Sequence, residues 1–217
     1  MRSKKEIAKR VVLFFMGTFF TALGVAFTKH GGLGVSPLSS VPDVVSIRFT
    51  ALTLGSWLTV WNGMIILAQI IILRKKFRPV QLLQIPMAII FGWCTDFGVW
   101  LVNSIPAEAY PARLLMVLIG IIVIAFGINL SVTADLILNC GEALIKAIAD
   151  TWNLNFGNVK TSLDIFFVSF SIFLSLIFFD FRIMGTREGT IISALFTGSF
   201  VKFFNRRLSP SIEKLLK

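Results

Sequence analysis

Charged and reactive residues are scarce in this sequence, and their scarcity argues against most soluble and catalytic classes of protein. Of its 217 residues only 15% are charged, while 56% are hydrophobic and 22 are Phe, which is unusual for a soluble globular domain. The single histidine and the two cysteines, Cys94 and Cys140, match no metal or disulfide spacing. The sequence also lacks a Ser-His-Asp set, a phosphate-binding loop and a dinucleotide fingerprint. We therefore expect a membrane protein that is not an enzyme, with no catalytic residues, metal or cofactor.

Acidic residues are outnumbered by basic ones, 11 to 21, which gives a formal net charge of +10. The basic residues fall in short clusters at the ends of apolar runs, not in one continuous basic patch. Clusters of this kind mark the cytoplasmic ends of membrane helices. We therefore expect no nucleic-acid partner and interpret the charge as a signal of membrane topology.

Six apolar runs approach the roughly 20 residues that a helix needs to cross a bilayer. They are Val11–Thr28, Trp57–Leu73, Val80–Val102, Leu114–Thr133, Thr161–Phe179 and Gly189–Phe204. The basic start followed by an apolar run resembles a secretory signal, but the pattern favours a retained first helix. The expected architecture is an all-α membrane protein with six transmembrane helices in one domain, residues 1–217.

This pattern is interrupted by two stretches that are more polar than the apolar runs, Gly31–Arg48 and Ala134–Asp150. Both are too short to cross the membrane. Each has the composition of a short helix, which either re-enters the membrane or lies at its surface. If the two helix starts meet near the midplane, their free N–H groups favour an anion or a polar acceptor. Their candidate pathway residues are Ser36, Ser39, Asn139 and Glu142.

The basic loop Arg74–Pro79 decides between two topologies. With six crossings this loop and both termini are inside, whereas crossings by the two short stretches as well would put the loop outside. Because basic residues concentrate on the cytoplasmic side, the six-crossing arrangement is favoured. We therefore expect a multi-pass membrane protein with both termini in the cytoplasm.

The two halves of the chain resemble each other weakly, at a displacement that aligns Gly17 and Gly24 with Gly120 and Gly127. The two polar stretches then coincide as well. Three crossings per half require the second half to be inverted in the membrane, a plan found in many transporters and channels. The expected repeats are about 11–102 and 114–204.

The same four glycines form two pairs, each spaced by about two helical turns, so the members of a pair share one helix face. Small residues on one face let helices approach closely in lipid. We interpret Gly17, Gly24, Gly120 and Gly127 as helix-packing residues, and direct contact of their backbone with a substrate is the alternative.

Two acids, Asp96 and Asp164, lie inside long apolar runs. An ionised carboxylate facing lipid costs a few kcal/mol, so each should face the bundle or be protonated. Asn62 aligns with Asp164 in the proposed repeat. Asp164, Asn62 and Asp96 are therefore further pathway candidates, and a purely structural hydrogen bond is the alternative for each acid.

Three features resemble the YczE/YyaS/YitT group of uncharacterised bacterial integral membrane proteins. They are the basic start with its glycine-bearing first helix, the stretch GGLGVSPLSSVP, and the stretch GTREGTIISALFTGSFVKFF near the end. The resemblance covers nearly the whole chain. It implies a protein of the bacterial cytoplasmic membrane without assigned catalytic residues.

The function expected from these features is movement of a small polar or anionic solute across the cytoplasmic membrane. The alternative is a non-transporting membrane partner or assembly factor for another system. A continuous polar cavity reaching Asp164 favours transport, whereas a tightly packed interior favours the partner role. The lipid bilayer is the one partner that the composition indicates, and the oligomeric state is left open.

Overall fold

Within residues 3–216, which the computed structural model describes, the regular structure consists of six long helices, two short ones and two 3₁₀ turns. The long helices are α1 (Lys4–Gly31), α3 (Leu54–Leu73), α4 (Gln84–Val102), α5 (Tyr110–Ala134), α7 (Phe156–Phe178) and α8 (Glu188–Leu216). The short helices are α2 (Pro37–Arg48) and α6 (Cys140–Trp152), and the 3₁₀ turns Arg74–Lys76 and Pro79–Leu83 join α3 to α4. The all-α part of the expected architecture is thus confirmed.

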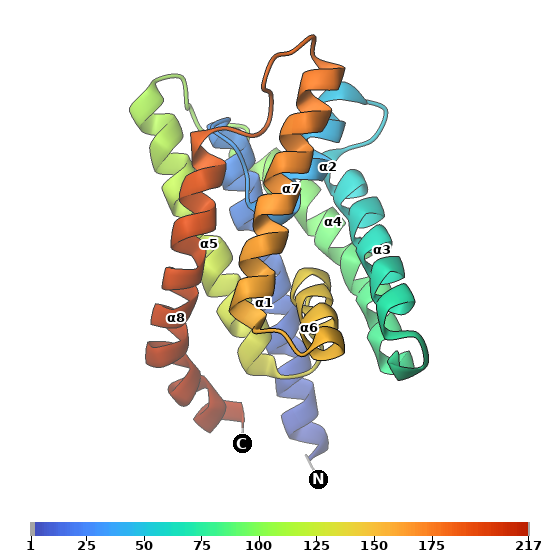
Figure 1. Ribbon diagram of the computed structural model, residues 1–217. Helices are drawn as coiled ribbons and strands as arrows, with labels where there is room; N and C mark the ends of the chain where they lie inside the picture. The colour runs from blue at the N-terminus through green and yellow to red at the C-terminus, as the bar shows by residue number, and fades with distance from the viewer. Residues whose placement is uncertain (1–2, 217) are drawn as a thin grey trace.

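The six long helices run side by side in alternating directions (Figure 1). Both chain ends and the basic turn Arg74–Lys76 lie at one end of the bundle, and the segment between α7 and α8 lies at the other. The short helices occupy opposite halves of the molecule, α2 towards the upper end in Figure 1 and α6 towards the lower.

Five stretches are long and apolar enough to cross a membrane. They are Lys4–Gly31, Leu54–Lys76, Pro79–Val102, Tyr110–Ala134 and Phe156–Phe178. The sixth expected run lies within α8, which does not meet this criterion over its described length. The five stretches indicate a multi-pass membrane protein.

Helix α1 begins at Lys4, well before the apolar run that predicted it. The Ser3 side chain accepts a hydrogen bond from the Glu6 N–H at 3.1 Å and so caps the helix. The Arg10 guanidinium bonds the Glu6 carboxylate at 2.9 Å and the Ala134 carbonyl, at the end of α5, at 3.1 Å. Polar contacts therefore extend the helix beyond what hydropathy indicates.

Helices α1 and α5 make the most extensive contact among the described helices, and the four glycines selected from the sequence lie in it. A Cβ added to Gly24 would come within 2.7 Å of the Gly120 carbonyl oxygen, and one added to Gly17 within 2.7 Å of the Gly127 oxygen. A Cβ added to Gly120 or Gly127 would in turn meet the backbone oxygen of Gly24 or Gly17, at 2.7 Å and 2.6 Å. The two backbones therefore touch at two levels, an approach that larger residues would prevent.

The other helix contacts lie both within and between the two halves of the chain. Helix α4 packs on α1 and α8 packs on α5, while each short helix crosses to the other half, α2 against α7 and α6 against α3. The Ser40 hydroxyl of α2 donates to the Phe167 carbonyl of α7 at 3.3 Å. The Gln69 amide of α3 donates to the Cys140 carbonyl of α6 at 3.2 Å. Buried hydrogen bonds thus hold each short helix to the opposite half.

Candidate functional site

The first turns of α2 and α6 meet inside the protein. A Cβ added to Gly141 of α6 would lie 2.7 Å from a methyl carbon of Leu38 in α2. Val41, Cys140 and Leu144 belong to one buried apolar cluster, which also includes residues of α3, α4 and α7. The starts of the two short helices are therefore enclosed by the long helices.

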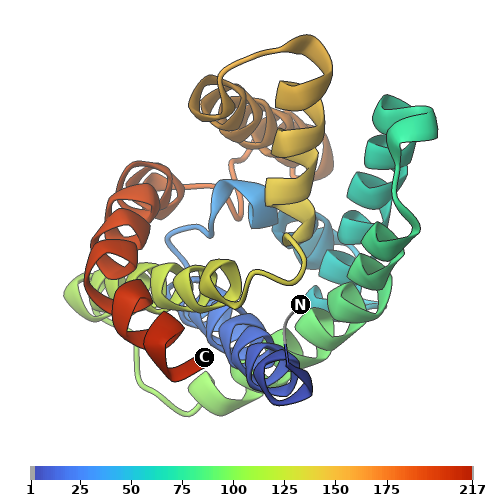
Figure 2. The same ribbon diagram turned by 90° about the horizontal axis from the view of Figure 1, so that it is seen from below.

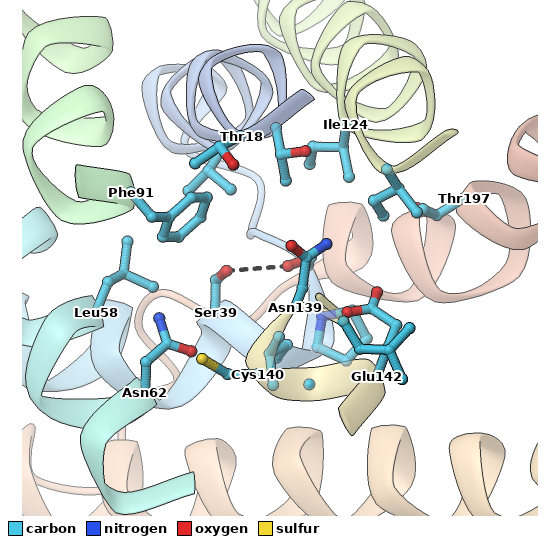
Figure 3. A pocket seen from close by; sticks show the side chains of 18 of the residues that line it. Thr18, Ser39, Leu58, Asn62, Phe91, Ile124, Asn139, Cys140, Glu142 and Thr197 are labelled. Atoms are coloured by element: carbon cyan, nitrogen blue, oxygen red, sulfur yellow. Dashed lines mark hydrogen bonds between the residues drawn. The ribbon is translucent and has the colours of Figure 1, made fainter. Parts of the chain in front are cut away.

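Both short helices begin with residues suited to a helix start. Pro37 is the first residue of α2, where its fixed φ and missing N–H cost nothing, and Asn139 precedes α6. Within the described residues, neither Ser36 nor Asn139 caps its helix through its side chain. Instead the Ser36 hydroxyl donates to the Ser39 hydroxyl at 3.0 Å, the dashed line in Figure 3. N–H groups at both helix starts remain available to a ligand, together with the positive ends of two helix dipoles.

A cavity of about 150 Å³ lies where these turns meet. Six of the seven pathway candidates line it, namely Ser36, Ser39, Asn62, Asn139, Glu142 and Asp164. Figure 3 shows Ser39, Asn62, Asn139 and Glu142 gathered around this space, with Leu58, Phe91 and Ile124 beside them. The site combines a largely apolar wall with a few polar groups, the usual composition of a small-molecule site.

Asp164 lies in the third turn of α7 and pairs with a lysine of the same helix. Lys160 donates to an Asp164 carboxylate oxygen at 3.0 Å, and the two side chains are 47% and 18% exposed. The two opposite charges largely cancel in the cavity. Sequence reasoning selected Asp164 but overlooked Lys160, although a spacing of four residues on a helix is a recognisable pairing signal.

Glu142 is the acid closest to the start of α6, in its first turn. One of its carboxylate oxygens, Oε2, is buried and has no hydrogen-bond partner among the described residues. Burial raises the pKa of Glu142; its own N–H, Lys160 and Asn139 oppose this effect, and Asp164 adds to it. Glu142 therefore stays protonated to a higher pH than an ordinary glutamate.

Cys140, the first residue of α6, also lines the cavity. Burial raises the pKa of its thiol to about 12, and the neighbouring Glu142 charge contributes in the same direction. The residue is therefore a neutral thiol at physiological pH and a poor nucleophile.

Asp96, the seventh pathway candidate, lies outside this cavity. Its carboxylate accepts hydrogen bonds from the Thr53 hydroxyl at 2.6 Å and from the Gly55 N–H at 2.8 Å. It thus bonds the start of α3 from the adjacent helix α4, an arrangement that the helix dipole favours.

An ion pair that sequence reasoning missed ties α1 to α2. Lys29, near the end of α1, contacts Asp43, whose side chain is 3% exposed. Burial raises the pKa of Asp43, and Lys29 partly opposes this rise. The connecting segment reverses direction through Gly32 and Gly34, at φ 63° and 112°, values that glycine adopts readily. The pairing depends on this reversal, which the spacing of the two residues does not reveal.

Comparison with known proteins assigns this chain to a family. The model of a family of unknown function, DUF6198, matches residues 8–206. The chain belongs to this family. The resemblance found in the sequence motifs is thereby confirmed, since two Bacillus subtilis (strain 168) proteins of that group are similar to this DUF6198 member.

The first relative is the uncharacterized membrane protein YczE, 24% identical over 203 residues, which cover 92% of this chain and 87% of YczE. The second is the uncharacterized protein YyaS, 29% identical over 119 residues, which cover 54% of this chain and 57% of YyaS. No solved structure matches this DUF6198 member. The likeness to YczE and the apolar helices together support a membrane protein.

Proposed function

We propose that this DUF6198 protein is a transporter or channel-like protein that moves a small polar or anionic solute through the cavity between α2 and α6. The observation that carries the proposal is the meeting of the two short-helix starts, at Leu38 and Gly141, beside a cavity with polar lining. Transporters commonly bind their solutes where interrupted helices meet near the membrane midplane.

The proposed topology has six crossings, α1, α3, α4, α5, α7 and α8, with α2 and α6 entering from opposite faces as parts of two inverted repeats. The alternating directions of the long helices support it (Figure 1). Helix α8 serves as the sixth crossing because it packs along α5, and its lower hydropathy is consistent with Ser193 and Thr197 lining the cavity. The end bearing Arg74–Lys76 and both termini faces the cytoplasm of a bacterium, in accordance with the positive-inside rule.

The charges around the cavity favour an anion or a polar acceptor. Lys160 neutralises Asp164, and burial raises the pKa of Glu142, which disfavours its negative charge. The partial positive charges of two helix starts, about half a unit each, then dominate the site. A cavity of about 150 Å³ restricts the enclosed part of the ligand to a small group.

The alternative role, a non-transporting partner, is less well supported because it predicts a tightly packed interior. The cavity beside Asp164 is the feature expected of a transporter instead. We assign no chemical reaction to the protein: the proposed role requires binding and release of a solute without bond formation.

The proposal is tested with purified protein in liposomes exposed to an osmotic gradient of formate, acetate, nitrate, urea or glycerol, with vesicle volume followed by light scattering. At least one solute should enter faster than in protein-free vesicles. Ile128→Trp, which fills the cavity from α5, should slow that entry. Ile122→Trp, on the same helix at a site 40% exposed on the outer surface, is the matched control. Rates equal to those of protein-free vesicles for every solute would reject transport of this class.

A further inference from the structure

The more extensive helix contacts of the two halves correspond to one another with one exception. The α1–α4 contact corresponds to α5–α8, the α2–α7 contact to α6–α3, and the α2–α3 contact to α6–α7. Helix α3 also packs closely on α4, but over their described lengths α7 and α8 make little contact. Figure 2 shows α3 and α4 adjacent and α7 and α8 apart.

The difference coincides with a difference in residue size. Gly92 of α4 lies against Gly55 of α3, and a Cβ added to Gly92 would come 2.5 Å from the Gly55 carbonyl oxygen. The displacement that aligns Gly17 with Gly120 puts Leu195 of α8 at the position of Gly92, and the displacement that aligns Asn62 with Asp164 puts Ala194 there. Both residues are larger than glycine, and the Leu195 side chain is 67% exposed.

The central cavity reaches this separation. Its lining includes Lys160 and Asp164 from α7, and Ala194, Thr197 and Gly198 from α8. A Cβ added to Gly198 would have no neighbouring atom within 4 Å among the described residues. The cavity is therefore not closed by packed side chains at Gly198.

The surface around the separation is apolar. On α8, Ile191 and Leu195 are 61% and 67% exposed and share one helix face with Gly198. On α7, Ile165, next to Asp164, is 62% exposed. In a membrane protein such side chains contact lipid, so the separation opens onto the hydrocarbon of the bilayer.

We propose that the cavity opens sideways to the bilayer between α7 and α8 and takes a small amphipathic anion, with its head group at the starts of α2 and α6 and its apolar chain in this opening. The inference rests on the proposed function and specifies its substrate class. The head group uses the N–H groups of the two helix starts, beside the buried and unpartnered Oε2 of Glu142, and the chain contacts Ala194, Gly198 and the apolar wall. A cavity of about 150 Å³ accommodates the head group, and the opening leaves the chain unrestricted.

The test measures thermal unfolding of the purified protein in lipid nanodiscs with decanoate, acetate, decanol or decylammonium. Decanoate should raise the melting temperature by about 5 °C near saturation, more than any other probe. Acetate lacks the chain, decanol lacks the charge, and decylammonium has the opposite charge. Equal stabilisation by decanoate and decylammonium, or by decanoate and acetate, would overturn the proposal.

Gly198→Trp should abolish stabilisation by decanoate, because its side chain occupies the opening without meeting existing atoms. Gly63→Trp is the matched control, since Gly63 lies on α3 away from the cavity and also has no neighbour within 4 Å. If Gly198→Trp fails to fold, Ala194→Phe provides a second obstruction. Undiminished decanoate binding by a folded obstructed variant would refute the lateral opening.

The decanoate experiment and the liposome assay test the lateral opening and transport separately. Loss of decanoate stabilisation in Gly198→Trp without any solute flux in the native protein would retain the opening and reject transport. Solute flux with unaltered decanoate binding in Gly198→Trp would retain transport and reject the opening.

Discussion

Leu38 at the start of α2 packs directly against Gly141 at the start of α6, so the two short helices touch end to end inside the bundle. A residue with a side chain fits at position 141 only if Leu38 moves, since an added Cβ would lie 2.7 Å from a Leu38 methyl carbon. This contact fixes the position of the polar groups that follow each helix start. Substitutions at Leu38 and Gly141 can test this contact.

Gly141→Leu should destabilise the protein by about 1–3 kcal/mol because its side chain requires the space of Leu38. Thermal unfolding in detergent measures the loss. The double variant Leu38→Ala, Gly141→Leu should recover part of it, since the alanine vacates that space. Additive losses in the double variant would show that the two residues do not compete for one site.

Gly24→Leu and Gly127→Leu should be more damaging still, because each forces apart the α1 and α5 backbones. We expect a loss of about 3 kcal/mol or more, or failure to assemble, when melting temperatures are compared in detergent. Gly63→Leu is the control, since nothing lies within 4 Å of its added Cβ. Similar small losses at all three positions would contradict the close contact.

The proposed topology predicts the labelling of single cysteines in a background lacking Cys94 and Cys140. Arg187→Cys should react with a membrane-impermeant maleimide in intact cells, and Lys76→Cys should react only after the cells are opened. The two residues lie at opposite ends of the bundle (Figure 1). Labelling of Lys76→Cys in intact cells would rule out the proposed orientation.

The pKa of Glu142 predicts how stability depends on pH. Because burial raises this pKa above its ordinary value of 4.5, the folded state favours the protonated carboxyl, and stability falls as pH rises above 4.5 through the folded-state pKa. Glu142→Gln stays neutral and avoids this loss. Its melting temperature, relative to the native protein, should rise by about 2–4 °C between pH 4.5 and pH 8. A difference that is independent of pH would mean that Glu142 ionises normally.

Asp164→Asn should separate structural and functional roles of the α7 acid. Removing one exposed helical ion pair costs only about 0.5 kcal/mol, so the variant should fold normally. If Asp164 balances Lys160 in the pathway, the variant leaves an uncompensated cation and alters solute entry into liposomes. Lys160→Gln, which removes the opposite charge, should shift entry in the opposite direction. Native rates in both variants would make the pair purely structural.

The sequence allowed the long helices and several polar residues of the cavity lining to be predicted, because both depend on local composition. Apolar runs indicated the helices, and Ser36-Pro37 and Asn139 indicated helix starts. Polar residues such as Asn62 stood out in apolar segments. These signals require no knowledge of which helices touch.

What could not be predicted depends on contacts between distant segments. Asp96 resembled Asp164 in the sequence, yet it bonds the start of α3, because only the fold brings Thr53 and Gly55 to it. The Lys29–Asp43 pair depends on a chain reversal. The separation of α7 from α8, where α3 and α4 pack closely, is recognised only once the two halves are compared in space.

The exchange of short helices between halves also determines the order of assembly during synthesis. Helix α2 ends at Arg48, but the helix that shelters it, α7, begins at Phe156 and supplies the Phe167 carbonyl to Ser40. The polar start of α2 therefore cannot reach its final surroundings when the first three long helices have entered the membrane. The ribosome must first complete α7, so the cavity between α2 and α6 is among the last parts of the molecule to form.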